Sequence, residues 1–348
     1  MALITMNLCK TESCYIIAEI GVNHGGDVSL AKEMIKAAKE SGADAVKFQT
    51  FTAESLVSIN TPKVKYQETT TDVNESHYDM IKALEFKRDD HLPVIEYCQS
   101  LNIDFISTPY DVESADFLNS IGVTIFKTAS ADIVDLDLHN YLAKLNKRVI
   151  VATGMSTLGE IEDTIKIYQA NNTLDKVTLL HCVSNYPCQH QSLNIRSMQT
   201  LAKAFGTDVG FSDHSIGSIG AIVSVSLGAT VIEKHFTLDK HMNGPDHKAS
   251  STPEEFSELV LSIRTAELCL GTLNKVVVDE ELQMRSVSRK SLFLKNDILE
   301  GQIISNDDIC LKRPGTGLYA KYRKVIAGSK AVRDLTRGKM LAFGDFCE

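Results

Sequence analysis

An eight-fold alternation of short apolar runs with amphipathic segments constrains the fold of this chain more than any other feature. The runs are CYIIAEI (14–20), ADAVKFQ (43–49), IDFISTP (103–109), VTIFKTAS (123–130), RVIVATG (148–154), KVTLLHC (176–182), DVGFSDH (208–214) and ATVIEKHF (229–236). Segments such as SLAKEMIKAAKESG, DVESADFLNSIG and STLGEIEDTIKIYQA separate them, with apolar residues three or four apart and Ser or Asp at several N-cap positions. This alternation is typical of parallel βα units. Eight units predict a (β/α)8 barrel.

Polar residues gather at the C-terminal end of every run. They are Glu19, Lys47 with Gln49, Thr108, Lys127 with Ser130, Thr153, His181, Asp213 with His214, and His235. Barrel enzymes place their chemistry at this end of the strands. The rival architecture, an open doubly wound sheet, usually carries a glycine-rich GxGxxG turn after its first strand, and EIGVNHGG lacks that pattern. The sequence therefore predicts a catalytic barrel.

The chain is too long for one core. Single cores stop growing at about 250–300 residues, and this chain has 348. We expect the barrel to occupy residues 1–272 and to end with a helix over 253–271. A connector is expected over 273–288, followed by a small, mostly β domain over 289–348 with strand-like runs at SLFL and at the end of KNDILEGQIIS, and a turn at Asn306-Asp307-Asp308.

Charge and cysteine content exclude several classes of protein. The net charge of −9 argues against nonspecific nucleic-acid binding. The segment from Arg285 to Glu348 is nevertheless basic, with 13 lysines and arginines against 7 aspartates and glutamates; it either docks on an acidic module or helps to close an anion site. No apolar run of about 18 residues and no secretory signal is present, and the 8 cysteines form no CxxC pair. We expect a cytoplasmic protein that does not enter a membrane.

His214 and His235 end the seventh and eighth runs, so their side chains should meet at the barrel mouth. Imidazole nitrogen suits zinc, manganese, iron or cobalt, and two ligands with open positions suit a Lewis-acid site. A lone histidine is more often a hydrogen-bonded core residue. The pairing at equivalent strand ends favours the metal site.

Lys47 and Lys127 also end strands, and a buried ammonium is costly unless it meets an anion or a carboxylate. They predict a phosphate or carboxylate ligand, to which Thr108, Ser130 and Ser212 can add neutral donors, although such hydroxyls often only cap helices. A Schiff-base aldolase is the competing interpretation of the lysines. Such an enzyme has no need of the paired histidines.

Two carboxylates complete the predicted site. Glu19 can orient a metal-bound water or a sugar hydroxyl or take part in proton transfer, or it can simply form a salt bridge to Lys47. Asp246 lies in the loop HMNGPDHKAS, which should overhang the mouth. It is a candidate for binding a polyol.

The phrases IIAEIGVNHGG, AVKFQTF, FISTP, SDHS, EKHFTLDK, GPDHKAS and KRPGTG, in this order, resemble the bacterial sialic acid synthases from about Tyr15 to the C-terminal domain. The resemblance implies a (β/α)8 barrel followed by an antifreeze-like (SAF) domain, in a domain-swapped homodimer whose small domain covers the partner's barrel. It implies condensation of phosphoenolpyruvate with N-acetylmannosamine, dependent on Mn²⁺ or Mg²⁺, to N-acetylneuraminate and phosphate with C–O cleavage.

The resemblance also implies roles for individual residues. The metal ligands would be His214 and His235; the phosphoenolpyruvate contacts would be Lys47, Thr108, Lys127, Ser130 and Ser212; the sugar contacts would be Glu19, Gln49, Tyr186 and Asp246, with Arg313 entering from the other subunit. Two positions depart from the family's usual pattern. Ser130-Ala131-Asp132 stands where Ser-Gly-Glu is typical, and Ala152-Thr153-Gly154 where Ser-Thr-Gly is typical. We hypothesise that Asp132 still acts as the acid/base.

The acceptor stays open between N-acetylmannosamine and the 2,4-diacetamido-2,4,6-trideoxy-mannose of legionaminic acid synthases, because GPDHKAS and AVKFQTF are compatible with both. Pseudaminic acid synthases usually lack the intact GPDHKAS loop. Outside this reaction, a non-catalytic carbohydrate-binding barrel and a metal-dependent sugar hydrolase are the alternatives. The second has no use for two strand-end lysines.

Overall fold

The computed structural model describes residues 13–64, 67, 71 and 75–347. The chain divides into two compact units, Met1–Gly271 and Thr272–Glu348. Each unit has its own hydrophobic core. Among the described residues, no helix is both long and apolar enough to cross a membrane.

The first unit is a closed barrel of parallel strands in sequential order, which confirms the predicted fold. The strands are β1 (Tyr15–Gly21), β2 (Ala45–Thr50), β3 (Asp104–Pro109), β4 (Ile125–Thr128), β5 (Arg148–Ala152), β6 (Val177–Cys182), β7 (Asp208–Asp213) and β8 (Val231–His235). Each lies within or almost within one of the predicted runs. The last strand pairs with the first, from Tyr15 opposite Val231 to Glu19 opposite His235.

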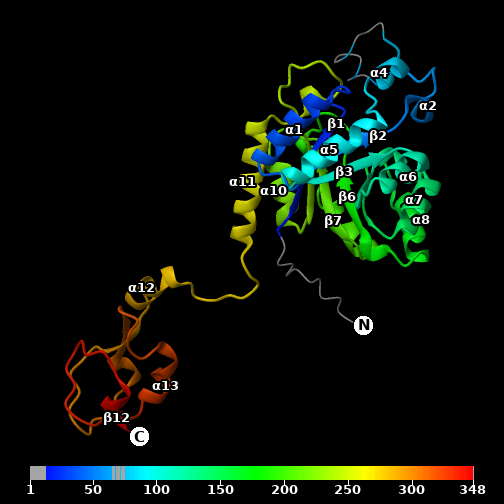
Figure 1. Cartoon of the computed structure of the whole chain (residues 1–348). Coiled ribbons are helices and arrows are strands. Elements are labelled where there is room, and N and C mark those ends of the chain that lie inside the picture. Colours follow the sequence, from blue (N-terminus) through cyan, green and yellow to red (C-terminus); the bar gives the residue numbers. More distant parts are fainter. Residues whose placement is uncertain (1–12, 65–66, 68–70, 72–74, 348) are drawn as a thin grey trace. The chain divides into compact units, whose positions relative to one another are not determined.

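Helices surround the barrel (Figure 1). They are α1 (Val28–Glu40), α2 (Ala53–Leu56), α4 (His77–Ala83), α5 (Arg88–Ser100), α6 (Val112–Ser120), α7 (Leu136–Leu145), α8 (Leu158–Ala170), α9 (Ser197–Phe205), α10 (Ile219–Ser226) and α11 (Pro253–Leu270). Several begin at a side-chain cap. Asp111 accepts the N–H of Ser114 at the start of α6, and Thr157 forms a capping box with Glu160 on α8. These caps fix where the loops from the strand ends turn into helices.

The barrel interior is closed by an apolar layer. It consists of Ile17, Ala45, Ile106, Ile125, Ile150, Leu180 and Val231, with Tyr15 packed against it. Because side chains alternate between the two faces of a strand, the residue two positions further along also points inward. Above Ile17 comes Glu19, above Ile125 comes Lys127, and above Val231 comes Glu233. The chain thus places a polar layer on an apolar floor.

Close packing at Gly210 of β7 gives a test of this arrangement. A Cβ there would lie 2.7 Å from Leu180 Cδ2 and closer still to the carbonyl oxygen of Val231. We expect Gly210→Ala to lower the free energy of unfolding by about 1–3 kcal/mol, measured by urea denaturation. The control is Gly159→Ala on α8, where the nearest atom would be 4.0 Å away; it should be neutral or stabilising by about 0.5–1 kcal/mol. Equal urea midpoints for Gly210→Ala and Gly159→Ala would contradict the close packing at Gly210.

The second unit is the small domain predicted after the barrel. It contains α12 (Asp279–Ser288), α13 (Arg323–Ile326) and two antiparallel pairs, β9 (Ser291–Leu294) with β10 (Ile309–Lys312) and β11 (Lys330–Ala331) with β12 (Phe346–Cys347). The SLFL run is a strand, as predicted. Three details differ: the expected connector contains α12, Asn306–Asp308 is a 3-10 helix, and QIIS contributes only an isolated bridge from Ile303 to Lys330. The strands of this domain have only two to four residues, so most of them are too short to show a strand pattern in the sequence.

Candidate functional site

Two buried ion pairs occupy the polar layer of the barrel. Lys47 Nζ lies 2.6 Å from Glu19 Oε2 and donates to Thr108 Oγ1 at 3.1 Å. Gln49 donates to the other oxygen of Glu19 at 3.1 Å. Burial raises the pKa of Glu19 above its ordinary value, against the opposing charge of Lys47. The alternative role predicted for Glu19, a salt bridge to Lys47, is thus present in the structure. This salt bridge lies in the barrel mouth beside other predicted site residues.

Glu233 is a central residue that the sequence reasoning missed. Its carboxylate lies 3.3 Å from Lys127 Nζ and 3.7 Å from Lys47 Nζ, and it accepts a hydrogen bond from Ser212 at 2.9 Å. Burial favours its neutral form, but the charges of Lys127 and Lys47 outweigh burial and lower the pKa of Glu233. The strand pattern could have identified Glu233, because it is two residues after the inward-facing Val231 and two before His235, so its side chain must also point inward.

The same carboxylate acts on Lys127. Burial disfavours the charged ammonium, but the charges of Glu233 and Glu19 together raise the pKa of Lys127 above its ordinary value. Each of the two lysines thus lies beside a carboxyl group at the barrel mouth, Lys47 beside Glu19 and Lys127 beside Glu233.

The two histidines converge as predicted. Their ring centroids are 5.6 Å apart, and Tyr186 lies over His214 with a centroid distance of 4.1 Å and edge-on to His235 at 5.7 Å. His214 Nδ1 lies 2.9 Å from the carbonyl oxygen of Val183, which only accepts. That nitrogen therefore carries the proton, and Nε2 keeps a lone pair when the ring is neutral.

This pair fits a divalent cation. His235 Nδ1 is buried and has no hydrogen-bond partner among the described residues. Burial, then the charges of His214 and Lys47, lower the pKa of His235 well below its usual value, which keeps the ring in the neutral form that binds metals. No group of three or more His, Cys, Asp or Glu side chains suited to a metal ion occurs in the described part of the chain. A cation held here would have two protein ligands and open positions.

Ser130 and Asp132 follow β4 in a short 3-10 helix, η1 (Ser130–Val134). Ser130 Oγ accepts the N–H of Gly154 at 3.0 Å, and Asp132 Oδ2 accepts the N–H of Ala129 at 3.2 Å. Burial raises the pKa of Asp132 to about 7, against the lowering effects of that hydrogen bond and of Lys127. A carboxyl group with this pKa can exchange a proton near neutral pH. Its acid/base role stays a prediction.

Asp132 gives a prediction about pH. We expect kcat/KM of the wild type to change with an apparent pKa near 7 and the Asp132→Asn variant to lose that change as well as turnover. Because the folded-state pKa is raised, the charged form opposes folding, so wild-type stability should fall relative to the variant as the pH rises from about 4 to about 7. Rate profiles and thermal melts across this range test both parts. Wild-type turnover in Asp132→Asn would refute the role.

Three other positions are placed less tightly. Burial and the charge of Glu19 raise the pKa of Asp246 to about 6. The carboxyl group of Asp246 is therefore near enough to Glu19 for the two charges to interact, and its contact with a polyol stays a prediction. Ala152 ends β5 and is buried without a hydroxyl to offer. Arg313 lies in the second unit after β10 with an exposed side chain. Its contact with a sugar remains a prediction.

Two residues counted among the polar strand ends do not face the mouth. His181 Nε2 bonds the carbonyl oxygen of Leu193 at 2.7 Å, and its ring stacks on Phe211 in the outer core. Asp213 pairs with Lys234 on the opposite face from Ser212 and Glu233. Both residues lie at the C-terminal ends of their strands, as predicted, but strand alternation turns their side chains outward.

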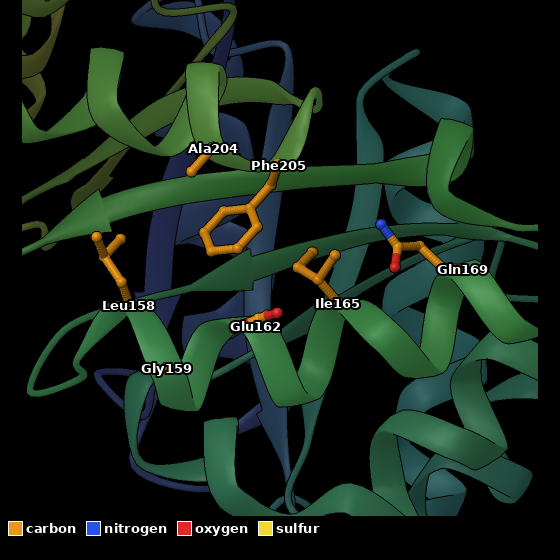
Figure 2. Close-up of a pocket in the computed structure, with 7 residues that line it drawn as sticks. All are labelled: Leu158, Gly159, Glu162, Ile165, Gln169, Ala204 and Phe205. Atoms are coloured by element: carbon orange, nitrogen blue, oxygen red, sulfur yellow. The ribbon is translucent and has the colours of Figure 1, made fainter.

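A separate hollow of about 310 Å³ lies on the outside of the barrel between α8 and α9. Figure 2 shows the Phe205 ring pointing towards α8 between Leu158 and Ile165. None of the predicted site residues lines it. The barrel mouth therefore remains the candidate active site.

Comparison with known proteins identifies the family. The model of the NeuB family matches residues 34–275, and that of the SAF domain matches residues 289–346. The chain belongs to the NeuB family. This NeuB-family chain is 46% identical to the N,N'-diacetyllegionaminic acid synthase of Legionella pneumophila, over 94% of this chain and 93% of that protein. It is 42% identical to the synthase of the same name from Campylobacter jejuni, over 94% and 98% of the two chains.

A solved structure of a NeuB-family relative supports the same assignment. The N-acetylneuraminic acid (sialic acid) synthetase of Leptospira borgpetersenii, determined in complex with citrate, matches with a TM-score of 0.69 and 33% identity. The match covers 78% of this chain and 90% of that one. The family resemblance and the SAF domain predicted from the sequence are confirmed.

Proposed function

We propose that this NeuB-family protein is a nonulosonic acid synthase, which condenses phosphoenolpyruvate with an N-acylated mannosamine-type sugar and releases phosphate. One observation carries the proposal: two buried lysines, each beside a carboxylate, share the barrel mouth with a pair of converging histidines. The lysines suit an anionic substrate and the histidines suit a Lewis-acidic cation. The hollow between α8 and α9 is lined by none of these groups.

Phosphoenolpyruvate would be held by Lys47 and Lys127, with hydroxyl donors from Thr108, Ser130 and Ser212. Ammonium groups bind phosphate and carboxylate oxygens strongly when water is excluded. Ser212 donates to Glu233, so its hydroxyl points into the polar layer. Gln49, Tyr186 and Asp246 would contact the sugar.

The cation would be held by His214 and His235, and Mn²⁺ or Mg²⁺ is proposed, with imidazole favouring Mn²⁺. When bound, it supplies Lewis acidity that polarises the acceptor aldehyde. The chain's own part is to fix both rings in place. Burial lowers the pKa of His235 and keeps that ring neutral, whereas Cys182 and the Val183 carbonyl outweigh burial and raise the pKa of His214. The Val183 carbonyl orients His214, and the Tyr186 ring packs against both imidazoles.

The proposed reaction forms one carbon–carbon bond, consumes one water molecule and releases phosphate. The C2–C3 π pair of phosphoenolpyruvate forms the new bond to the aldehyde carbon, and the aldehyde oxygen gains a proton. Water then adds to C2 and loses one proton, which leaves a hydroxyl there. The C–O bond to phosphate breaks with its electron pair leaving on the phosphate oxygen, while the hydroxyl loses its proton and becomes the C2 carbonyl. Asp132 and Glu19 are proposed to hold and move these protons, since burial raises the pKa of both carboxyl groups. Lys47 and Lys127 stabilise the departing phosphate.

We propose 2,4-diacetamido-2,4,6-trideoxy-mannose as the acceptor in place of N-acetylmannosamine. The support is that the relatives at 46% and 42% identity are N,N'-diacetyllegionaminic acid synthases. Phosphate release from phosphoenolpyruvate should be measured with each acceptor, with and without chelator. We expect kcat/KM to be at least about tenfold higher for the diacetamido sugar. A higher value for N-acetylmannosamine would make the protein an N-acetylneuraminate synthase instead.

A homodimer in the cytoplasm is also proposed, with Arg313 of one protomer contacting the N-acyl group in the barrel of the other. The end of the first unit and the start of the second expose large apolar side chains, including Leu268 at 83%, Leu273 at 75% and Met284 at 65%. None of the seven described cysteines forms a disulfide. Mixing inactive His235→Gln and Arg313→Ala chains tests the exchange. Partial recovery of activity in mixed dimers is expected, and no recovery in verified mixed dimers would contradict it.

A further inference from the structure

An ion pair lies directly behind the two histidines. Lys234 Nζ and Asp213 Oδ2 are 2.8 Å apart, and their side chains are 5% and 0% exposed. Asp213 immediately precedes His214 and Lys234 immediately precedes His235. None of the steps proposed above uses this pair, since both side chains point away from the mouth.

Both side chains of the pair also form hydrogen bonds with Ser215, the residue that follows His214. The Lys234 ammonium also donates to the carbonyl oxygen of Ser215 at 2.7 Å. Asp213 Oδ1 accepts from both the backbone N–H and the hydroxyl of Ser215, at 2.9 Å and 2.7 Å. The pair therefore binds the chain on both sides of His214 and ties it to strand β8.

The pair also fixes the register of the two strands. Asp213 and Lys234 are direct partners across β7 and β8, as are Ser212 and Glu233, which are hydrogen-bonded on the mouth side. Both faces of the strand pair thus carry a cross-strand polar contact in the same register. A slip by one residue would turn the mouth-facing side chains outward and separate the two imidazoles.

Stability alone does not explain such a pair. A buried ion pair contributes little net stability compared with apolar residues of similar size, because both charges lose their hydration. A fixed geometry is what it supplies. We propose that Asp213 and Lys234 are positioning residues, which hold the imidazoles of His214 and His235 at the separation that one divalent cation requires. This inference rests on the proposed metal role of the two histidines.

The test is Mn²⁺ binding to the full-length, metal-stripped protein, measured by calorimetry without substrates. We expect Asp213→Asn, which keeps the shape and loses the charge, to weaken Mn²⁺ binding by about tenfold or more. The double variant Asp213→Asn/Lys234→Met should recover thermal stability, because no unpaired charge stays buried, but not Mn²⁺ affinity. The control is Arg264→Met, which breaks a half-buried pair with Asp44 elsewhere in the barrel; it should lower the melting temperature with Mn²⁺ affinity unchanged.

If Asp213→Asn and the double variant do not fold, a milder substitution still tests the proposal. Ser215→Ala removes only the hydroxyl contact to Asp213, and about threefold weaker Mn²⁺ binding is expected with a near-wild-type melting temperature. Folded Asp213→Asn or Ser215→Ala with wild-type affinity would overturn the inference, as would an equal loss of affinity in Arg264→Met. A wild type that binds no Mn²⁺ would instead refute the proposed metal role itself.

Discussion

Replacing His235 with glutamine is expected to lower kcat/KM by about a thousandfold or more while the barrel stays folded. The substitution removes one of two imidazoles at the mouth, and the remaining His214 cannot hold a cation alone at the same affinity. Lewis-acid polarisation of a carbonyl is worth several kcal/mol, and each 1.36 kcal/mol is about tenfold in rate. Phosphate release at saturating Mn²⁺ measures the loss.

The control for this variant is His139→Gln. His139 is fully buried, but it lies on α7 and bonds the Tyr168 hydroxyl at 3.0 Å. Its replacement should cost stability with kcat/KM within a few-fold of wild type. If His235→Gln retained wild-type kcat/KM, or if the two variants lost activity equally, the histidine pair would not be the metal site.

Lys127→Met is expected to lower kcat/KM by about a hundred- to a thousandfold, the usual effect of losing one preorganised electrostatic contact to a developing anion. The loss should include a raised KM for phosphoenolpyruvate, because the proposed contact is with its phosphate or carboxylate. The variant should also melt at a lower temperature. Glu233 would lose its nearest charged partner and keep the more distant Lys47 at 3.7 Å, and a buried carboxylate with reduced compensation is costly.

Stability and function can be separated at this position. The double variant Lys127→Met/Glu233→Gln removes both charges of the pair, so it should regain thermal stability without regaining activity. Lys166→Met, which breaks an exposed pair with Glu162 on α8, serves as the control and should match wild type in both measurements. Recovery of activity in the double variant would show that Lys127 acts only through the fold.

The barrel and most of its mouth could be predicted because both follow from simple periodicities. Eight runs of strand length separated by amphipathic segments leave few folds, and the inward positions of each strand recur every second residue. That rule places Glu19, Lys47 and Lys127 correctly. Applied strictly, it also finds Glu233 and excludes Asp213 and His181, which a looser search for polar strand ends did not do.

Other features depend on contacts that no local pattern encodes. The pairing of Glu233 with two lysines joins three strands, and the capping of Ala129 by Asp132 depends on how the chain turns after β4. The position of Arg313 depends on the assembly of two chains, so a single sequence supports it only through family resemblance. The acceptor is the hardest to predict, since the phrases GPDHKAS and AVKFQTF are compatible with both candidate sugars.

We propose that the barrel mouth joins phosphoenolpyruvate to a sugar aldehyde in a reaction that requires a cation. The most direct test incubates metal-stripped protein with phosphoenolpyruvate carrying ¹⁸O in the bridging C–O position and with the diacetamido sugar. After Mn²⁺ is added, phosphate containing ¹⁸O and a nonulosonic acid should form in equal amounts, and neither should form without the sugar or the cation. Sugar binding with no turnover of phosphoenolpyruvate under any of these conditions would contradict the account and favour a non-catalytic carbohydrate-binding barrel.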